Sequence, residues 1–175
     1  MANAPKQVDV YTDGACIDNP GAGGYGVVLR YQRPRKGLYR KELSGGFRLT
    51  TNNRMELMAV IVGLSALKGR CSVALHSDSE YIVSSIRAGL PQRWKERGWK
   101  RGKRSKVLNT DLWQQVIDLL SKHEVKPVWV KGHSGNPENE RCDQLAMGAA
   151  HRLGLPADVG YEREHPHIGL GAQRF

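Results

Sequence analysis

Four acidic residues stand at positions from which an α/β fold can assemble a catalytic site. Asp13 ends one predicted strand, and Asp78 follows another. Glu56 lies in the first turn of a predicted helix, and Asp143 lies in the second turn of the last one. Active sites of α/β folds lie at the carboxyl ends of strands, where helix starts contribute further side chains. The four carboxylates are therefore candidates for one shared site.

Carboxylates that meet in this way need a positive partner. Two bare carboxylates about 4 Å apart repel by about 4 kcal/mol at an effective dielectric constant of 20, so a cluster requires protonation, basic neighbours or divalent metal. An all-oxygen ligand set suits Mg²⁺ or Mn²⁺ better than zinc. Two such ions, about 3.5–4 Å apart, would serve phosphodiester cleavage by activating a water and stabilising the leaving oxygen.

Each acid also has an ordinary structural explanation. Asp13 could start a turn, Glu56 could belong to a capping box, and Asp78 could cap the following helix. Asp143 could be a solvated residue beside an apolar stripe. Spacing alone leaves these alternatives open.

The elements that must position the acids follow from hydrophobic periodicity. Three successive predicted strands with short connections, over residues 7–13, 25–31 and 38–49, imply an antiparallel meander. The chain then alternates helices and strands. The predicted helices and strands are a helix from residue 53, a strand over 72–77, helices over 79–88 and 108–123, a strand over 125–131 and a helix from 137. This order predicts an α/β mixed sheet with helices on its faces.

The length of 175 residues fits one domain, which we place over residues 1–155. Helical periodicity stops after Gly154, so residues 156–175 are predicted to form a flexible tail. Gly21, Gly23 and Gly26 match the dinucleotide fingerprint G-x-G-x-x-G, but they lead into a strand and not into a helix. They are predicted to shape a turn and a bulge.

Charge points to a polyanionic partner. Lys and Arg number 27 against 17 Asp and Glu, a net charge of +10, although a surplus of this kind can also serve solubility alone. The densest basic segment, residues 93–106, interleaves its cations with Trp94 and Trp99. Such a cluster can neutralise several phosphates. The alternative is a solvated face anchored by its tryptophans.

The remaining composition indicates a cytoplasmic protein with no membrane span. The three cysteines are widely spaced and form no C-x-x-C pair, a pattern typical of free thiols in a reducing compartment. The N-terminus has no apolar core of a signal peptide, and no apolar run approaches the ~20 residues that a bilayer needs. No coiled-coil seam appears, so we expect a monomer.

Six strings together carry a family resemblance. YTDGAC, NPGAGGYG, TTNNRMELMAV, SDSEYI, RWKERGWK and WVKGHSGNPENERCDQLA closely resemble bacterial type I ribonuclease H, in the family's order and over residues 6–161. The resemblance implies a ribonuclease H fold with a five-stranded mixed sheet. It also implies an endonuclease that cuts the RNA strand of RNA–DNA hybrids to 5′-phosphate and 3′-hydroxyl ends, and so removes RNA primers and R-loops.

The resemblance further implies roles for individual residues. Asp13 would bridge two Mg²⁺ ions, for which Mn²⁺ is an expected substitute. Glu56 and Asp78 would hold the metal on the leaving-group side, and Asp143 the metal that activates water. His133 would assist proton movement or product departure; on its own, a histidine in this flexible loop could equally be a surface residue.

The resemblance also implies substrate contacts, in the minor groove, at a DNA phosphate and on a basic handle over residues 90–106. The matching positions are Cys16, Asn19, Thr51, Asn52, Asn53, Trp94, Lys95, Arg97, Trp99 and Lys100. The chain departs from the family pattern at Glu80, where an amide is frequent, and at Leu90, Pro91 and Glu96 in the handle.

Two other functions remain open at this point. One is a hybrid-binding module without cleavage, against which the presence of all the acids argues. The other is a junction resolvase or another nuclease of the same architecture, against which the basic handle and the TTNNRMEL string argue.

Overall fold

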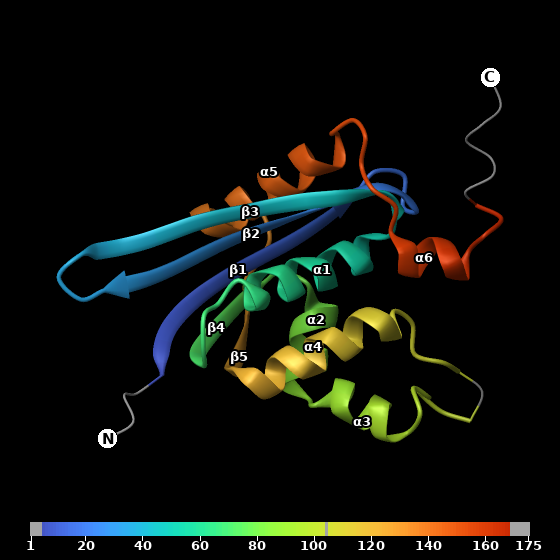
Figure 1. The fold of residues 1–175 in the computed structure, drawn as a ribbon, viewed down its shortest axis with the longest axis horizontal. Helices are drawn as coiled ribbons and strands as arrows, with labels where there is room; N and C mark the ends of the chain where they lie inside the picture. The colour runs from blue at the N-terminus through green and yellow to red at the C-terminus, as the bar shows by residue number, and fades with distance from the viewer. Residues whose placement is uncertain (1–4, 104, 169–175) are drawn as a thin grey trace.

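The computed structural model describes residues 5–103 and 105–168 and contains one five-stranded sheet of order β3-β2-β1-β4-β5 (Figure 1). The strands are β1 (Lys6–Cys16), β2 (Gly21–Arg33), β3 (Gly37–Thr50), β4 (Cys71–Ser77) and β5 (Glu124–Trp129). β1, β2 and β3 pair antiparallel, whereas β4 pairs parallel with β1 and with β5. The predicted mixed sheet and its meander are confirmed.

Helices cover both faces of this sheet. They are α1 (Asn52–Ser65), α2 (Glu80–Arg87), α3 (Leu90–Glu96), α4 (Thr110–Lys122), α5 (Pro137–Ala150) and α6 (Val159–Glu164). Figure 1 shows α1 and α4 on one side of the sheet and α5 on the other. The predicted start of α5 is confirmed, because Asn136 caps the helix and proline follows it.

The core forms between the sheet and α1. Val8, Val10 and Thr12 of β1 alternate with more exposed neighbours and are buried. Gly63 of α1 lies against Val10, so the helix backbone approaches the strand closely. Each fully buried aliphatic side chain contributes about 1.5–3 kcal/mol relative to exposure, so this layer fixes the position of α1 firmly.

The strand β1 is longer than its sequence pattern predicts. Asp13 was expected at the end of the strand, but pairing continues to Cys16 and places Asp13 inside it, opposite Gly26. The extension is possible because small residues follow Asp13 and pair with the glycine-rich start of β2. The predicted bulge is also present, as a register shift between Gly21 and Gly23.

The expected flexible tail is corrected for residues 156–168. Arg48 N donates to Pro156 O at 2.9 Å, and Asp158, which caps α6, is only 4% exposed. A buried arginine of α1 binds Asp158 and ties this segment to the domain. Residues 169–175 lie outside the described part of the chain. None of the helices in residues 5–103 and 105–168 combines the length and the apolar composition needed to cross a bilayer.

Candidate active site

The first acid, Asp13, meets α1 because of the glycine that follows it. A Cβ atom at Gly14 would collide with the backbone of Met55 and Glu56, so only glycine lets the start of α1 rest on β1. Gly14 N also donates to Asp13 Oδ1 at 2.8 Å. The same residue therefore orients the first carboxylate and admits the helix that carries the second.

Glu56 is held by side chains on two elements. Ser79 Oγ donates to Glu56 Oε2 at 2.6 Å, and Asn52 Nδ2 donates to Glu56 Oε1 at 3.0 Å. The capping-box alternative is not observed, because Thr51 is the N-cap of α1 and its side chain accepts from Arg54 N. The carboxylate of Glu56 is thus turned toward the end of β4.

Asp78 follows β4 at the edge where the parallel strands end. The register pairs Tyr11 with His76, two residues before Asp13 and Asp78 respectively, so both acids lie at the same level of the sheet. Asn139 Nδ2 of α5 donates to Asp78 Oδ2 at 3.1 Å. Asp78 does not cap α2, since Ser79 is its N-cap.

Asp143 reaches this edge because α5 packs tightly on the sheet. Gly26 and Gly24 of β2 lie under the helix, and a Cβ atom at either would collide with α5 backbone carbonyls. Gly26 is the residue opposite Asp13 in the β1–β2 pairing. The second turn of α5, which carries Asp143, is therefore brought over the strand position of Asp13.

The charges of the other three acids reach Asp13. Burial raises the pKa of Asp13 to about 8, with further upward contributions from the charges of Asp78, Asp143 and Glu56. Burial also raises the pKa of Glu56, and the charge of Asp78 adds to this effect. In the part of the chain that the structure describes, no ion pair joins any of these acids to Lys, Arg or His.

The donor set fits a hard divalent cation. Carboxylate oxygens without basic partners suit Mg²⁺ or Mn²⁺. Across the described residues, no three His, Cys, Asp or Glu side chains form a group ready to hold a metal ion. The acids therefore influence one another electrostatically without forming a closed cage.

His133 lies on the connection between β5 and α5. It is exposed and has a positive φ of 50°. The preceding Gly132 lies against Asp78, where a Cβ atom would crowd the carboxylate. The exposed loop position agrees with the predicted one.

The polar residues expected to contact substrate gather next to Glu56. Asn19 Oδ1 accepts from Asn52 N at 3.1 Å, which joins the turn after β1 to the start of α1. Cys16 Sγ lies 3.4 Å from Thr50 O, and burial raises the pKa of its thiol. Thr51 uses its hydroxyl as the α1 cap, whereas Asn53 is exposed.

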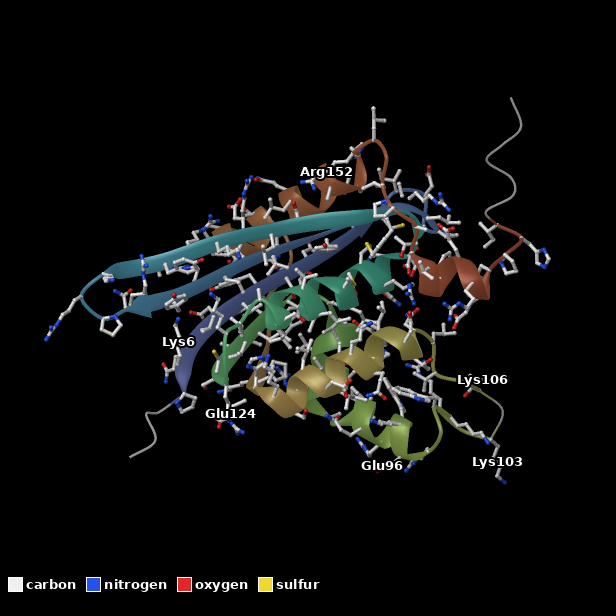
Figure 2. All side chains as sticks on the ribbon, viewed as in Figure 1. Lys6, Glu96, Lys103, Lys106, Glu124 and Arg152 are labelled. Atoms are coloured by element: carbon white, nitrogen blue, oxygen red, sulfur yellow. The ribbon has the colours of Figure 1, made fainter. Side chains whose placement is uncertain are left out.

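The basic handle consists of α3 and the loop that leads to α4. Trp94 is 6% exposed and meets Trp113 edge to face, at 5.5 Å between ring centroids. This burial makes Trp94 an anchor of the handle, and its contact with substrate stays a prediction. Trp99 is half-buried, whereas Lys95, Arg97 and Lys100 are exposed. Figure 2 shows the neighbouring Glu96, Lys103 and Lys106 at the periphery, away from the sheet.

Sequence reasoning missed the residues that orient the acids. Ser79 was interpreted only as part of a helix start, and Asn139 was not singled out. Asn139 is buried, and its Oδ1 finds no hydrogen-bond partner among the described residues. Its spacing of four residues before Asp143 on the same helix is a signal that could have found it.

The order of the strands and the helices on both faces define a ribonuclease H-like α/β fold. The family model described as RNase H matches residues 5–151. A curated protein of Syntrophus aciditrophicus, Ribonuclease H, is 60% identical over 156 residues, which cover 89% of this chain and 87% of that protein. The chain therefore belongs to the RNase H family.

Solved structures agree with this assignment. LC9-RNase H1, a type 1 RNase H with the type 2 active-site motif, matches with a TM-score of 0.75 and 32% identity, covering 97% of this chain and 85% of that one. LC11-RNase H1, solved in complex with an RNA/DNA hybrid, shares the fold with a TM-score of 0.56 and 22% identity, covering 82% and 96% of the two chains.

Proposed function

We propose that this enzyme hydrolyses the RNA strand of RNA–DNA hybrids with the help of two divalent cations, Mg²⁺ by preference and Mn²⁺ as a substitute. The observation that carries the proposal is the half-buried Asp13, whose pKa is raised by burial and by the charges of three further acids and which has no basic partner among the described ion pairs. The name of the Syntrophus relative and the hybrid bound to LC11-RNase H1 support the choice of substrate.

Asp13, Glu56, Asp78 and Asp143 are the residues that would hold the cations. Bound there, divalent cations would lower the pKa of an attacking water and neutralise charge that builds up on the phosphate. The hydrogen bonds from Ser79 and Asn52 keep both oxygens of Glu56 in place before substrate arrives. Such preorganisation avoids reorganisation during the reaction.

His133 serves proton movement and product departure. Hydrolysis adds the water oxygen to phosphorus and breaks the bond to the 3′ oxygen, which leaves a 5′-phosphate and a 3′-hydroxyl. The 3′ oxygen must acquire a proton, and a protonated imidazole nitrogen is a donor that can supply one. The exposed position of His133 supports this role, because the side chain is free to approach a bound strand.

The polar cluster beside Glu56 reads the nucleic acid. Phosphate contacts cannot distinguish RNA from DNA, so discrimination needs groups that reach the minor groove and the ribose 2′-hydroxyl. Cys16, Asn19, Asn52 and Asn53 would supply such groups, and Thr51 would contact a DNA phosphate. The exposed cations of the handle would then hold the DNA strand.

We also propose that the enzyme acts in the cytoplasm as a monomer. The three cysteines are free, and Cys71 and Cys142 are buried in the domain. This suits a reducing compartment, where thiols stay unpaired. Gel filtration with light scattering would measure the oligomeric state.

A cleavage assay tests the proposed function. Labelled RNA–DNA hybrid, duplex RNA and duplex DNA are incubated with Mg²⁺ or with a chelator, and the ends of the products are mapped. We expect cleavage of the RNA in the hybrid alone, only with metal. Asp13→Asn should abolish cleavage and still bind the hybrid. Binding without cleavage by the wild type would favour a binding module, and cleavage of duplex DNA or junctions would favour another nuclease.

A further inference from the structure

We propose that a groove between α2 and β5 binds an unpaired ribonucleotide of the RNA strand, where that strand continues beyond the hybrid. The groove, called here the Trp129 groove, measures about 350 Å³ and is lined by Glu80, Val83, Ser84, Arg87 and Trp129. The inference rests on the proposed function, because it concerns the strand that the enzyme cuts.

The Trp129 groove lies next to the acidic edge of the sheet. Trp129 is the last residue of β5 and pairs with Ser77, the last residue of β4. Val130 N donates to Ser77 O at 3.0 Å, so the pairing persists to the position where Asp78 begins. Adjacent strands are about 4.8 Å apart. The opposite wall starts at Glu80, only two residues after Asp78.

Trp129 is exposed, whereas Trp94 and Trp113 are buried in the core. Its exposed fraction is 51%, against 6% for Trp94 and 0% for Trp113. An indole ring left in water at the rim of a site offers a stacking surface for a nucleobase, and every base can use it. Burying it under a base would also remove apolar area from water.

The other walls suit a base better than a phosphate. The buried Val83 provides an apolar floor. Arg87 Nη2 donates to Pro127 O at 3.4 Å, which holds the guanidinium near β5. Glu80 and Arg87 contribute one charge of each sign, so the groove is close to neutral. The carboxylate of Glu80 and the hydroxyl of Ser84 provide hydrogen-bonding groups for a base edge or a ribose.

The occupant must be unpaired. In a hybrid the bases stack on one another and their faces are covered, whereas single-stranded ribonucleotides can splay out and stack on aromatic side chains. A volume of about 350 Å³ lies at the lower end of the range for small-molecule sites and so fits one base with its sugar. An RNA strand whose phosphate lies at the acids would pass this groove on leaving the duplex.

Hybrid binding tests the inference directly. Dissociation constants are measured by fluorescence anisotropy in the presence of a chelator, for blunt hybrid and for hybrids with a short 5′ RNA, 3′ RNA or DNA extension. We expect one RNA extension to tighten binding by about 5- to 150-fold, the range for stacking of one base. Trp129→Ala should abolish this gain and leave blunt-hybrid affinity and cleavage unchanged. Trp129→Phe should retain part of the gain.

A matched control is Leu153→Ala, which removes another exposed apolar side chain, 100% exposed and far along the chain. It should keep the full gain from the RNA extension. Equal affinity of wild type for blunt and extended hybrids would overturn the inference. A gain that persists in Trp129→Ala, or that appears only with the DNA extension, would overturn it as well.

A second readout separates this inference from the proposed function. Single-stranded RNA should quench the fluorescence of the wild type, and Trp129→Phe should lose this quenching. Quenching that survives in Trp129→Phe would move the stacking to another tryptophan and refute the inference. This measurement requires no cleavage, so failure of the cleavage assay and failure of the groove can be told apart.

Discussion

Loss of the Asp158 carboxylate should destabilise the domain through the buried Arg54. The guanidinium is 2% exposed, and its Nε and Nη2 donate to Asp158 at 2.7 and 2.8 Å. Thr50 Oγ1 donates to the same carboxylate at 2.7 Å. Asp111 is the second acidic partner, at 2.7 Å from Nη2, and its carboxylate is partly exposed.

The expected magnitude follows from burial. Asp158→Asn keeps the shape of the side chain but removes its charge and turns one acceptor into a donor that faces Arg54. Removing one partner of a buried ion pair costs about 3–5 kcal/mol, and because Asp111 still pairs with Arg54 we expect a loss near the lower end of that range. Since domains are stable by about 5–15 kcal/mol, the variant should still fold at room temperature.

Urea unfolding monitored by circular dichroism measures this loss. The matched control is Glu162→Gln, which breaks the pair between Arg48 and Glu162, where Arg48 is largely exposed. An exposed pair contributes about 0–1 kcal/mol, so this control should unfold near the wild-type midpoint. If Asp158→Asn lost no more free energy of unfolding than Glu162→Gln, the assignment of a stabilising buried network to the C-terminal segment would be refuted.

Four further outcomes are expected. In Asn139→Ala, Asp78 loses a hydrogen-bond donor. Activation by Mg²⁺ should therefore weaken by about 10- to 100-fold, the usual cost of losing a hydrogen-bond partner of a metal ligand. An unchanged metal titration would contradict this expectation. His133→Ala should slow multiple-turnover cleavage and leave metal binding intact, whereas unchanged turnover would exclude the proposed role. Hydrogen bonds from Arg141, and then from Arg40, lower the pKa of Glu42 from 4.5 to about 2. The stability that this carboxylate gives the fold is therefore present above pH 4.5 and is lost as pH falls toward 2. Glu42→Gln should accordingly flatten the acid limb of a stability profile, and a parallel profile would argue against the pair. Neutralising three exposed cations of the handle, Lys95, Arg97 and Lys100, should reduce the slope of log affinity against log salt concentration by up to about 2.7. An unchanged slope would exclude the handle from binding.

Much of the fold could be predicted because its elements are locally patterned. Strand and helix periods gave the meander, the alternation that follows it and the start of α5 at Asn136. The four acids could be named because each was predicted near a strand end or a helix start, and the collinear motifs added their family. Asp13 was misplaced by the local pattern, since Gly14 looks like a turn but continues the strand.

The C-terminal segment could not be predicted for a physical reason. The contact that orders it joins Arg54 to Asp158, 104 residues apart in the chain. No local period encodes such a pair, and Arg54 sits on a helix where arginine is normally solvated. The family-model match also ends at residue 151 and so leaves this segment out. Only the three-dimensional structure shows that the arginine is buried and needs two acids.

The convergence of the acids depends on glycines, which have no side chain to keep the elements apart. Gly14 admits α1 to β1, and Gly24 with Gly26 admits α5 to β2, each at a distance that a Cβ atom would forbid. The glycines of β2 match a dinucleotide-binding fingerprint, but they do not form a phosphate loop. The bulge explains only part of their role. Their second role is to let α5 pack closely on β2, which brings the helix turn that carries Asp143 near the strand position of Asp13. The acidic site is therefore encoded as much by these glycines as by the acids themselves, because carboxylates on helices held farther away would not share one electrostatic environment.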